Sequence, residues 1–201
     1  MPEVYSFLSE NTALIVHFSG TPPMPSTWHE PRTYPEDLRN VIRGGAMGGL
    51  CCSVVRPGDD FETGGRNACG YVGVIVGLQC KHALVAVDPE DCGSYCNERG
   101  FREVAKPTDI TVQGLQKTLT DRNSWNEWVV RDYEVLGIFF VKPYLVWREL
   151  AAGTSAEVPT SPDAISSTFP EQRSFTFSSE GILQFSGGHY TQVPHSKIYC
   201  P

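Results

Sequence analysis

Polar residues that can do chemistry stand where the first apolar run of the chain stops. The stretch ALIVHFSGTPPMP places His17, Ser19 and Gly20 directly after the apolar residues that begin at Ala13. This run predicts a buried strand, and the prolines that follow cannot continue it. Because fixed side chains at the mouth of a sheet commonly meet a small ligand, His17 and Ser19 are candidate binding residues. The competing interpretation is a structural histidine held by a backbone carbonyl.

A carboxylate stands at the start of a later apolar strand. Glu127 opens the run EWVV, and Glu134 follows seven residues later in RDYEVLG. In a site that excludes water, a fixed carboxylate stabilises positive charge that develops on a reacting sugar. Either glutamate is also explained as a solvated residue beside a strand. Trp125 and Trp128 would wall a dry pocket around Glu127, although aromatic residues at such positions more commonly belong to the core.

Other motifs give weaker signals for chemistry. The stretch RGGAMGG lacks the GxGxxG spacing and the Lys-Ser/Thr of a phosphate-binding loop, so it predicts a helix stop and a tight turn. Cys80, His82, Cys92 and Cys96 supply four zinc ligands, but their spacing is poor for a structural zinc site, and we expect no metal. A thiol hydrolase needs a cysteine beside a helix amino terminus or a cation, and none of the seven cysteines is visibly placed in this way.

Length and charge limit the class of protein. A chain of 201 residues fits one large domain, or a domain with an appendage. It carries 16 basic and 23 acidic residues, and residues 57–98 hold two basic groups against seven acidic ones, which disfavours a general nucleic-acid-binding surface. No apolar run approaches the roughly 20 residues that span a bilayer, and residues 1–11 carry no basic n-region. We expect a cytoplasmic protein whose thiols are reduced and mostly buried.

Short strands dominate the elements that must position these residues. The stretch YPEDLRNVIRGG predicts a short helix that stops at Gly44, and residues 108–119 predict a second helix. Strands are expected within 13–18, 48–56, 68–80, 82–88, 101–105 and 127–147. These patterns predict an α+β fold with a strand-rich central sheet, mixed or antiparallel, and two or three short helices.

The last fifty residues differ in composition from the rest. Residues 151–172 are rich in Ser, Thr, Pro and Ala, which is typical of a linker, and residues 173–201 alternate as a β-hairpin would. We therefore expect one domain over residues 1–150, a linker and a C-terminal β-hairpin appendage. A small three-stranded piece is the alternative for the same residues. Because two strands alone are only marginally stable, a hairpin must dock on the domain or on a partner.

The order of these features resembles the ADP-ribosyltransferase superfamily. The matching features are VHFSG, a helix that ends in IRGG, a small-residue strand that contains Ser53, and Glu127 at the start of a late strand. They cover residues 13–150 and look closest to small toxin and abortive-infection proteins with a histidine in an HFT or HFS context. The resemblance implies NAD as the substrate and an intracellular nucleic acid or protein as the target. It also implies a toxin–antitoxin or phage-defence role and a neutralising protein partner.

The resemblance assigns roles to three residues. His17 would bond the ribose on the nicotinamide side, Ser19 would line the same pocket, and Glu127 would engage a hydroxyl of that ribose. As nicotinamide leaves, the carboxylate of Glu127 would stabilise the oxocarbenium-like state. His17 and Glu127 are therefore the expected catalytic residues.

Other parts of the implied pocket are fixed by no motif. Arg43 is a candidate contact for a phosphate or carboxylate, and Tyr71 or Tyr133 would stack against the substrate. An alternative from another class is a non-catalytic interaction module of an immunity or phage-defence system. Its acidic segment, residues 57–98, would complement a basic patch on another protein.

Overall fold

The structure is a computed structural model that describes residues 2–19, 33–46, 48–61, 70–106, 110–120, 126–151 and 154–199. The helices are α1 (Pro2–Glu10), α2 (Glu36–Ile42), α3 (Val112–Thr120), α4 (Pro162–Thr168) and α5 (Ser196–Tyr199). The strands are β1 (Leu14–Phe18), β2 (Leu50–Val55), β3 (Val72–Leu78), β4 (Leu84–Asp88), β5 (Ser94–Cys96), β6 (Arg102–Val104), β7 (Glu127–Val130), β8 (Tyr133–Phe140), β9 (Leu145–Ala151), β10 (Thr154–Pro159), β11 (Ser174–Ser178), β12 (Gly181–Ser186) and β13 (His189–Val193).

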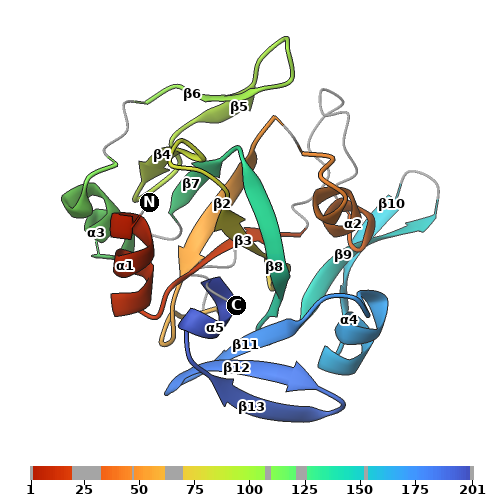
Figure 1. The fold of residues 1–201 in the computed structure, drawn as a ribbon. Helices are drawn as coiled ribbons and strands as arrows, with labels where there is room; N and C mark the ends of the chain where they lie inside the picture. The colour runs from red at the N-terminus through yellow and green to blue at the C-terminus, as the bar shows by residue number, and fades with distance from the viewer. Residues whose placement is uncertain are drawn as a thin grey trace.

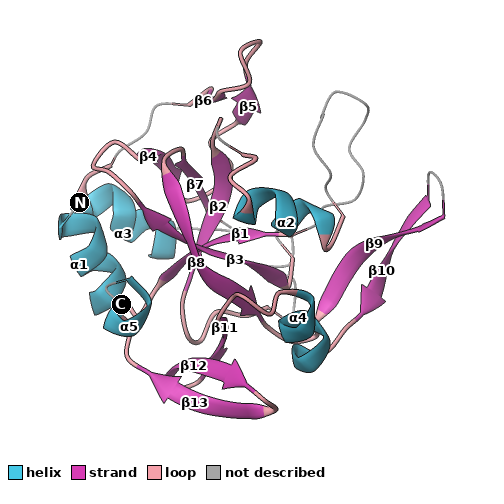
Figure 2. Cartoon of the chain, turned by 45° about the vertical axis from the view of Figure 1, so that its right-hand side comes forward, coloured by secondary structure: helices cyan, strands magenta, loops and turns pink. Residues whose placement is uncertain are grey.

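Nine of these strands form one sheet, in the order β13-β12-β11-β8-β3-β1-β2-β7-β4 (Figure 1). Neighbouring strands run antiparallel except β11 and β8, which are parallel. The other four strands form two separate two-stranded ribbons, β5–β6 and β9–β10, which project from the body (Figure 2). The expected α+β fold with a central mixed sheet is confirmed.

Side-chain alternation along the strands divides the core between two faces of the sheet. On one face, Ile15, Val54 and Trp128 pack with apolar side chains of the first four helices; we call this the helix face. The opposite face carries Val16 and Val55 from the same strands. The opposite face is covered in part by side chains from Phe61, Phe175 and Ile198.

The sheet is split between β1 and β3. These strands pair only over Val16–Phe18 of β1, and the backbone groups left beyond the pairing are bound by side chains. The N–H of Ile15 donates to Tyr199 Oη at 2.8 Å, and His195 Nε2 lies 2.8 Å from the carbonyl oxygen of Ala13. On the β3 side, the N–H of Leu78 donates to Tyr5 Oη, which donates to the carbonyl of the same residue. Side chains from both α1 and α5 therefore fill the split.

Two regions differ from the sequence expectation. Helix α1 was not among the predicted helices. Residues 151–172, expected to be a linker, instead contain all of strand β10 and helix α4. Ser161 caps α4 by accepting a hydrogen bond from the N–H of Ala164, and Pro162 follows at the first turn.

Residues 173–201, expected as a hairpin appendage, contribute three strands and α5 to the body of the fold. Strand β11 pairs with β8, so β11, β12 and β13 continue the main sheet. No helix in the part of the chain that the structure describes is long and apolar enough to cross a membrane.

Candidate active site

The carboxylate of Glu127, at the start of β7, is the centre of a buried polar cluster. The residue is only 3 % exposed. Its Oε1 accepts hydrogen bonds from Cys51 Sγ at 2.6 Å and Ser94 Oγ at 2.5 Å. Its Oε2 accepts from the backbone N–H and the thiol of Cys92, at 2.8 and 2.6 Å. Four donors compensate the loss of water around a buried carboxylate.

These contacts set the charge state of the cluster. Burial by itself raises the pKa of Glu127, but the hydrogen bonds from Cys51, Cys92 and Ser94 together lower that pKa below its ordinary value. Burial and the adjacent Glu127 carboxylate raise the pKa of both the Cys51 and the Cys92 thiols. Glu127 is therefore an anion at neutral pH, and the two cysteines are neutral donors. This arrangement disfavours a thiolate nucleophile at either cysteine.

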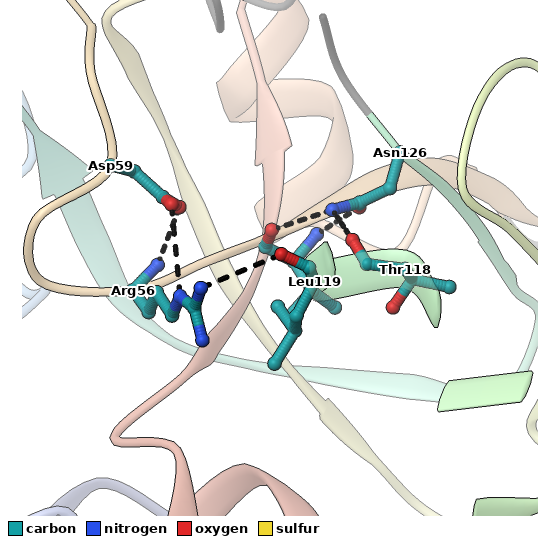
Figure 3. A network of polar contacts seen from close by, with 6 residues as sticks. Arg56, Asp59, Thr118, Leu119 and Asn126 are labelled. Atoms are coloured by element: carbon teal, nitrogen blue, oxygen red, sulfur yellow. Dashed lines mark hydrogen bonds and ion pairs between the residues drawn. The ribbon is translucent and has the colours of Figure 1, made fainter. Parts of the chain in front are cut away.

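A second buried group, Asn126, fixes the position from which Glu127 projects (Figure 3). Asn126 is 0 % exposed. Its Nδ2 donates to the carbonyls of Val54 and Thr118, both at 2.9 Å, and its Oδ1 accepts from the N–H of Val54 at 2.7 Å. We call these three residues the Asn126 clamp. The clamp ties the start of β7 to β2 and to the last turn of α3.

The clamp is supported at its margins by further polar contacts. Ser53 Oγ donates to the carbonyl of Asn126 at 2.9 Å, and Trp128 Nε1 donates to Thr118 Oγ1 at 3.1 Å. Figure 3 also shows Arg56, which pairs with Asp59 and reaches the carbonyl of Leu119 at 3.5 Å. The backbone beneath Glu127 is thus anchored on two sides before its own side chain is considered.

His17 is connected to this cluster through Cys51. Its Nδ1 lies 2.8 Å from the carbonyl oxygen of Cys51, while the thiol of the same cysteine donates to Glu127. By strand alternation, His17 shares the helix face with Ile15, whereas the Glu127 side chain lies on the opposite face. The interpretation of His17 as a histidine held by a backbone carbonyl therefore describes its observed contact.

Ser19 and Arg43 are positioned by α2. Ser19 Oγ donates to the buried carboxylate of Asp37 at 2.5 Å, so its hydroxyl links the end of β1 to this helix. Arg43 is exposed at the carboxyl end of α2. Residues 20–32, which follow Ser19, lie outside the described residues. The structure therefore places Ser19 and Arg43 at opposite ends of one helix.

The two candidate stacking tyrosines lie apart from each other. Tyr71 is buried in the cluster of the opposite face with Phe61 and Phe139, so its ring is not on the side of His17. Tyr133 is half-buried on β8, and its hydroxyl donates to the carbonyl of Val41 at 3.1 Å. The structure thus does not bring the Tyr71 ring together with His17.

The remaining candidates are also separated from the cluster. Glu134 is exposed on β8, with β3, β1 and β2 between that strand and β7. Trp128 is buried in the core of the helix face, where it stacks on Phe7, and Trp125 lies outside the described residues. Of the two glutamates considered, only Glu127 occupies a buried polar site.

The four zinc candidates do not share a site. The Cys80 thiol faces Asp132 at 3.5 Å, Cys92 binds Glu127, and both His82 and Cys96 are exposed. Within the described ranges, no group of three or more His, Cys, Asp or Glu residues has the geometry to hold a metal ion.

Two cavities in the described part of the chain lie elsewhere. One, of about 660 Å³, is mainly polar and includes Glu10, Arg56 and Glu180 in its lining. The other, of about 650 Å³, is more apolar and includes Phe177 and Tyr190. Neither is lined by His17 or Glu127. We place the candidate site at Glu127 because of its chemistry, although both of these cavities lie on other parts of the surface.

Cys51, Cys92, Ser94 and Asn126 are the site residues that the sequence interpretation missed. One signal for Cys51 was present, since adjacent cysteines in a strand must point to opposite faces. Comparison with known proteins adds no assignment, because no family model matches the chain and no curated protein or solved structure gives a significant match.

Proposed function

We propose that this protein is an ADP-ribosyltransferase-like enzyme that uses NAD as its substrate. The observation that carries the proposal is the Glu127 carboxylate, which is ionised, withdrawn from water and bonded to a hydroxyl at 2.5 Å. A ribose hydroxyl has the same donor chemistry as the Ser94 hydroxyl that now occupies this oxygen. Glu127 is therefore suited to bind a sugar hydroxyl and to present negative charge beside it.

The chemistry follows from this charge. When the N-glycosidic bond of NAD breaks, its electron pair leaves with nicotinamide and positive charge develops on the ribose. The fixed anion of Glu127 stabilises this charge most strongly where water is excluded. A nucleophile of the target nucleic acid or protein then bonds to the same ribose carbon and loses its proton. Under this mechanism Glu127 is the catalytic carboxylate.

The arrangement of strands assigns the ribose to Glu127 rather than to His17. β1, β2 and β7 are adjacent, with Val16 opposite Ser53 and Cys52 opposite Trp128. The strands that carry His17 and Glu127 thus flank β2, but the two side chains lie on opposite faces of the sheet. The mechanism therefore gives His17 no contact with the ribose. The proposed setting is that of an intracellular toxin or phage-defence protein restrained by a protein partner.

Label transfer from NAD tests the proposal. Purified protein is incubated with labelled NAD and cell extract, and label on macromolecules is counted. Removing one charge-stabilising group typically lowers a rate by about 10²–10³-fold, so Glu127→Gln should reduce transfer by roughly that factor. The matched control is Glu134→Gln, the same chemical change at an exposed position of β8, which should leave transfer intact. Equal transfer by wild type and Glu127→Gln would rule out the assigned mechanism.

A non-catalytic interaction module is the second candidate. Two observations favour it: all four hydrogen bonds to Glu127 come from the protein itself, and neither of the two cavities described above reaches the residue. Melting in the presence of NAD separates the two candidates. NAD at 100 times its dissociation constant should stabilise a binding protein by about 2.7 kcal/mol. No shift at millimolar NAD, in wild type and in variants that uncover Glu127, would favour the interaction module.

A further inference from the structure

Most of the cover on Glu127 comes from one short segment. Residues 92–94, here called the strap, provide three of the four hydrogen bonds: those from the N–H and thiol of Cys92 and from the hydroxyl of Ser94. The fourth comes from Cys51 on β2. Only Cys51 belongs to the main sheet, so a displacement of the strap alone would open the carboxylate while leaving the strands in place.

The strap continues into a part of the fold that is not fully buried. It leads into the β5–β6 ribbon, which is separate from the main sheet and extends away from it (Figures 1 and 2). Two outward aromatic residues of the ribbon, Tyr95 and Phe101, are 46 % and 47 % exposed. A two-stranded ribbon has little stability of its own in water, so its docking contacts determine its position.

Those docking contacts are both apolar and polar. Cys92 packs with Ala86 of β4 and Val129 of β7, and the partly buried Val104 of the ribbon packs against them. Arg131 Nη2, just after β7, donates to the carbonyl of Arg102. The N–H of Arg102 donates to the carbonyl of Gly48 at 2.7 Å, and Arg102 Nη1 reaches Ser94 Oγ at 3.3 Å. The N–H groups of Ala105 and Lys106 donate to the carbonyls of Gly93 and Cys92, both at 3.2 Å, but these bonds join the strap to its own ribbon. The contacts of the strap with Glu127 therefore act together with this apolar cluster to hold the ribbon on the main sheet.

We propose that the strap covers the Glu127 carboxylate by occupying both of its oxygens. A substrate must displace the strap before the substrate can bind. The inference rests on the proposed function, because it takes a hydroxyl-bearing substrate as the competitor. The hydroxyl of Ser94 occupies the oxygen that a ribose hydroxyl would use, and the amide and thiol of Cys92 occupy the other oxygen. The closed form is thus inactive, and the open form presents an anion ready for the ribose.

Alkylation of Cys92 measures opening without any ligand. Cys92 is 0 % exposed, so its thiol reacts only when the strap leaves. The wild-type reference and every variant in this experiment carry Cys96→Ser. Cys92 is then the only cysteine between Lys81 and Arg99, so one tryptic peptide reports on its alkylation. The rate of its reaction with N-ethylmaleimide is followed by mass spectrometry.

Three variants of the ribbon form a matched set. Ser94→Ala loses a hydrogen bond to a charged group, which should speed alkylation of Cys92 by roughly tenfold or more. Ser94→Thr keeps a hydroxyl and should react near the wild-type rate. Tyr95→Phe, at the neighbouring exposed position, loses only a hydroxyl that bonds Glu103, so it should also match wild type. Each variant is checked for cooperative melting.

NAD supplies the second measurement. Saturating NAD should speed alkylation of Cys92, and Ser94→Ala should bind NAD several-fold more tightly than Tyr95→Phe. If wild type binds NAD while Ser94→Ala and Tyr95→Phe show equal alkylation and equal affinity, the strap proposal is overturned and the proposed function stands. If Ser94→Ala speeds alkylation but no variant binds NAD, the proposed function is overturned, and the opening of the strap is supported.

Discussion

Asn126 and Glu127 are consecutive buried polar residues, yet they are held by different kinds of partner. The side chain of Asn126 bonds only backbone groups, which belong to β2 and α3. Glu127 bonds two thiols, a hydroxyl and one amide, and most of these come from the strap. Backbone partners within a sheet and a helix cannot be exchanged without unfolding, whereas side-chain donors on a ribbon can be. The comparison separates a fixed support from an exchangeable cover.

The largest expected loss of stability comes from a change in the Asn126 clamp. Asn126→Ala leaves the N–H and carbonyl of Val54 and the carbonyl of Thr118 without their partner in the core. Each buried unsatisfied group costs about 1–3 kcal/mol, so we expect the free energy of unfolding to fall by roughly 3 kcal/mol or more. Urea denaturation measures the change. Gln116→Ala, on the exposed side of α3, is the control and should stay within about 0.5 kcal/mol. Equal effects of the two changes would contradict the role of the clamp.

The next effect depends on pH. Because the folded pKa of Glu127 is lowered, its carboxylate stabilises the fold above the unfolded pKa of about 4.3. This stabilisation is lost as pH falls below that value and through the folded pKa. At neutral pH, Glu127→Gln should be about 2 kcal/mol less stable than wild type, from the loss of hydrogen bonds to a charged acceptor. The difference should shrink in acid.

Denaturation at a series of pH values between neutral and about 3 tests this dependence. Exposed Glu134→Gln serves as the reference, since the same chemical change there should give no pH-dependent difference. A constant gap between wild type and Glu127→Gln at every pH would show that the carboxylate charge is not what stabilises the cluster.

The smallest loss of stability is expected from a change in the strap. Cys92→Ala removes one thiol donor and little volume, while the backbone N–H of residue 92 still reaches Glu127. We expect a loss of about 1 kcal/mol in the free energy of unfolding, well below that of Asn126→Ala. Thermal or urea denaturation gives the value. A loss as large as that of Asn126→Ala would mean that the strap is part of the fixed support, and the contrast between the two neighbours would disappear.

Local patterns predicted most elements near the site, because periodicity and turn residues act over a few positions. The strand that contains His17, the helix before Gly44 and the strand that begins at Glu127 all lie within the predicted stretches. Helix α4 is hidden by the Ser, Thr and Pro content of its stretch, which is also typical of a linker, although Ser161 and Pro162 form a recognisable helix start. Capping residues therefore carry local information that composition does not.

The composition of the Glu127 cluster was much harder to predict. Cys51 and Cys92 lie 76 and 35 residues from Glu127 in the chain, and no local rule pairs them. The choice between Glu127 and Glu134 was likewise undecidable from pattern, because both stand beside apolar strands. The fold buries the Glu127 side chain and leaves that of Glu134 exposed, a difference that no local pattern contains. Similarly, Tyr71, just before β3, packs in the cluster of the face away from His17.

The split between β1 and β3 has a consequence for synthesis of the protein on the ribosome. The N–H of Ile15 donates to a hydroxyl that lies 184 residues further along the chain. The carbonyl of Ala13 contacts an imidazole that lies 182 residues away. Contacts of such long sequence separation form late and slow the search for the native state. A nascent chain can form its hairpins early. The backbone groups at the split between β1 and β3, however, lack these partners until residues 195–199 have emerged from the ribosome. During translation, the middle of the sheet is thus the part most exposed to aggregation and most dependent on chaperones.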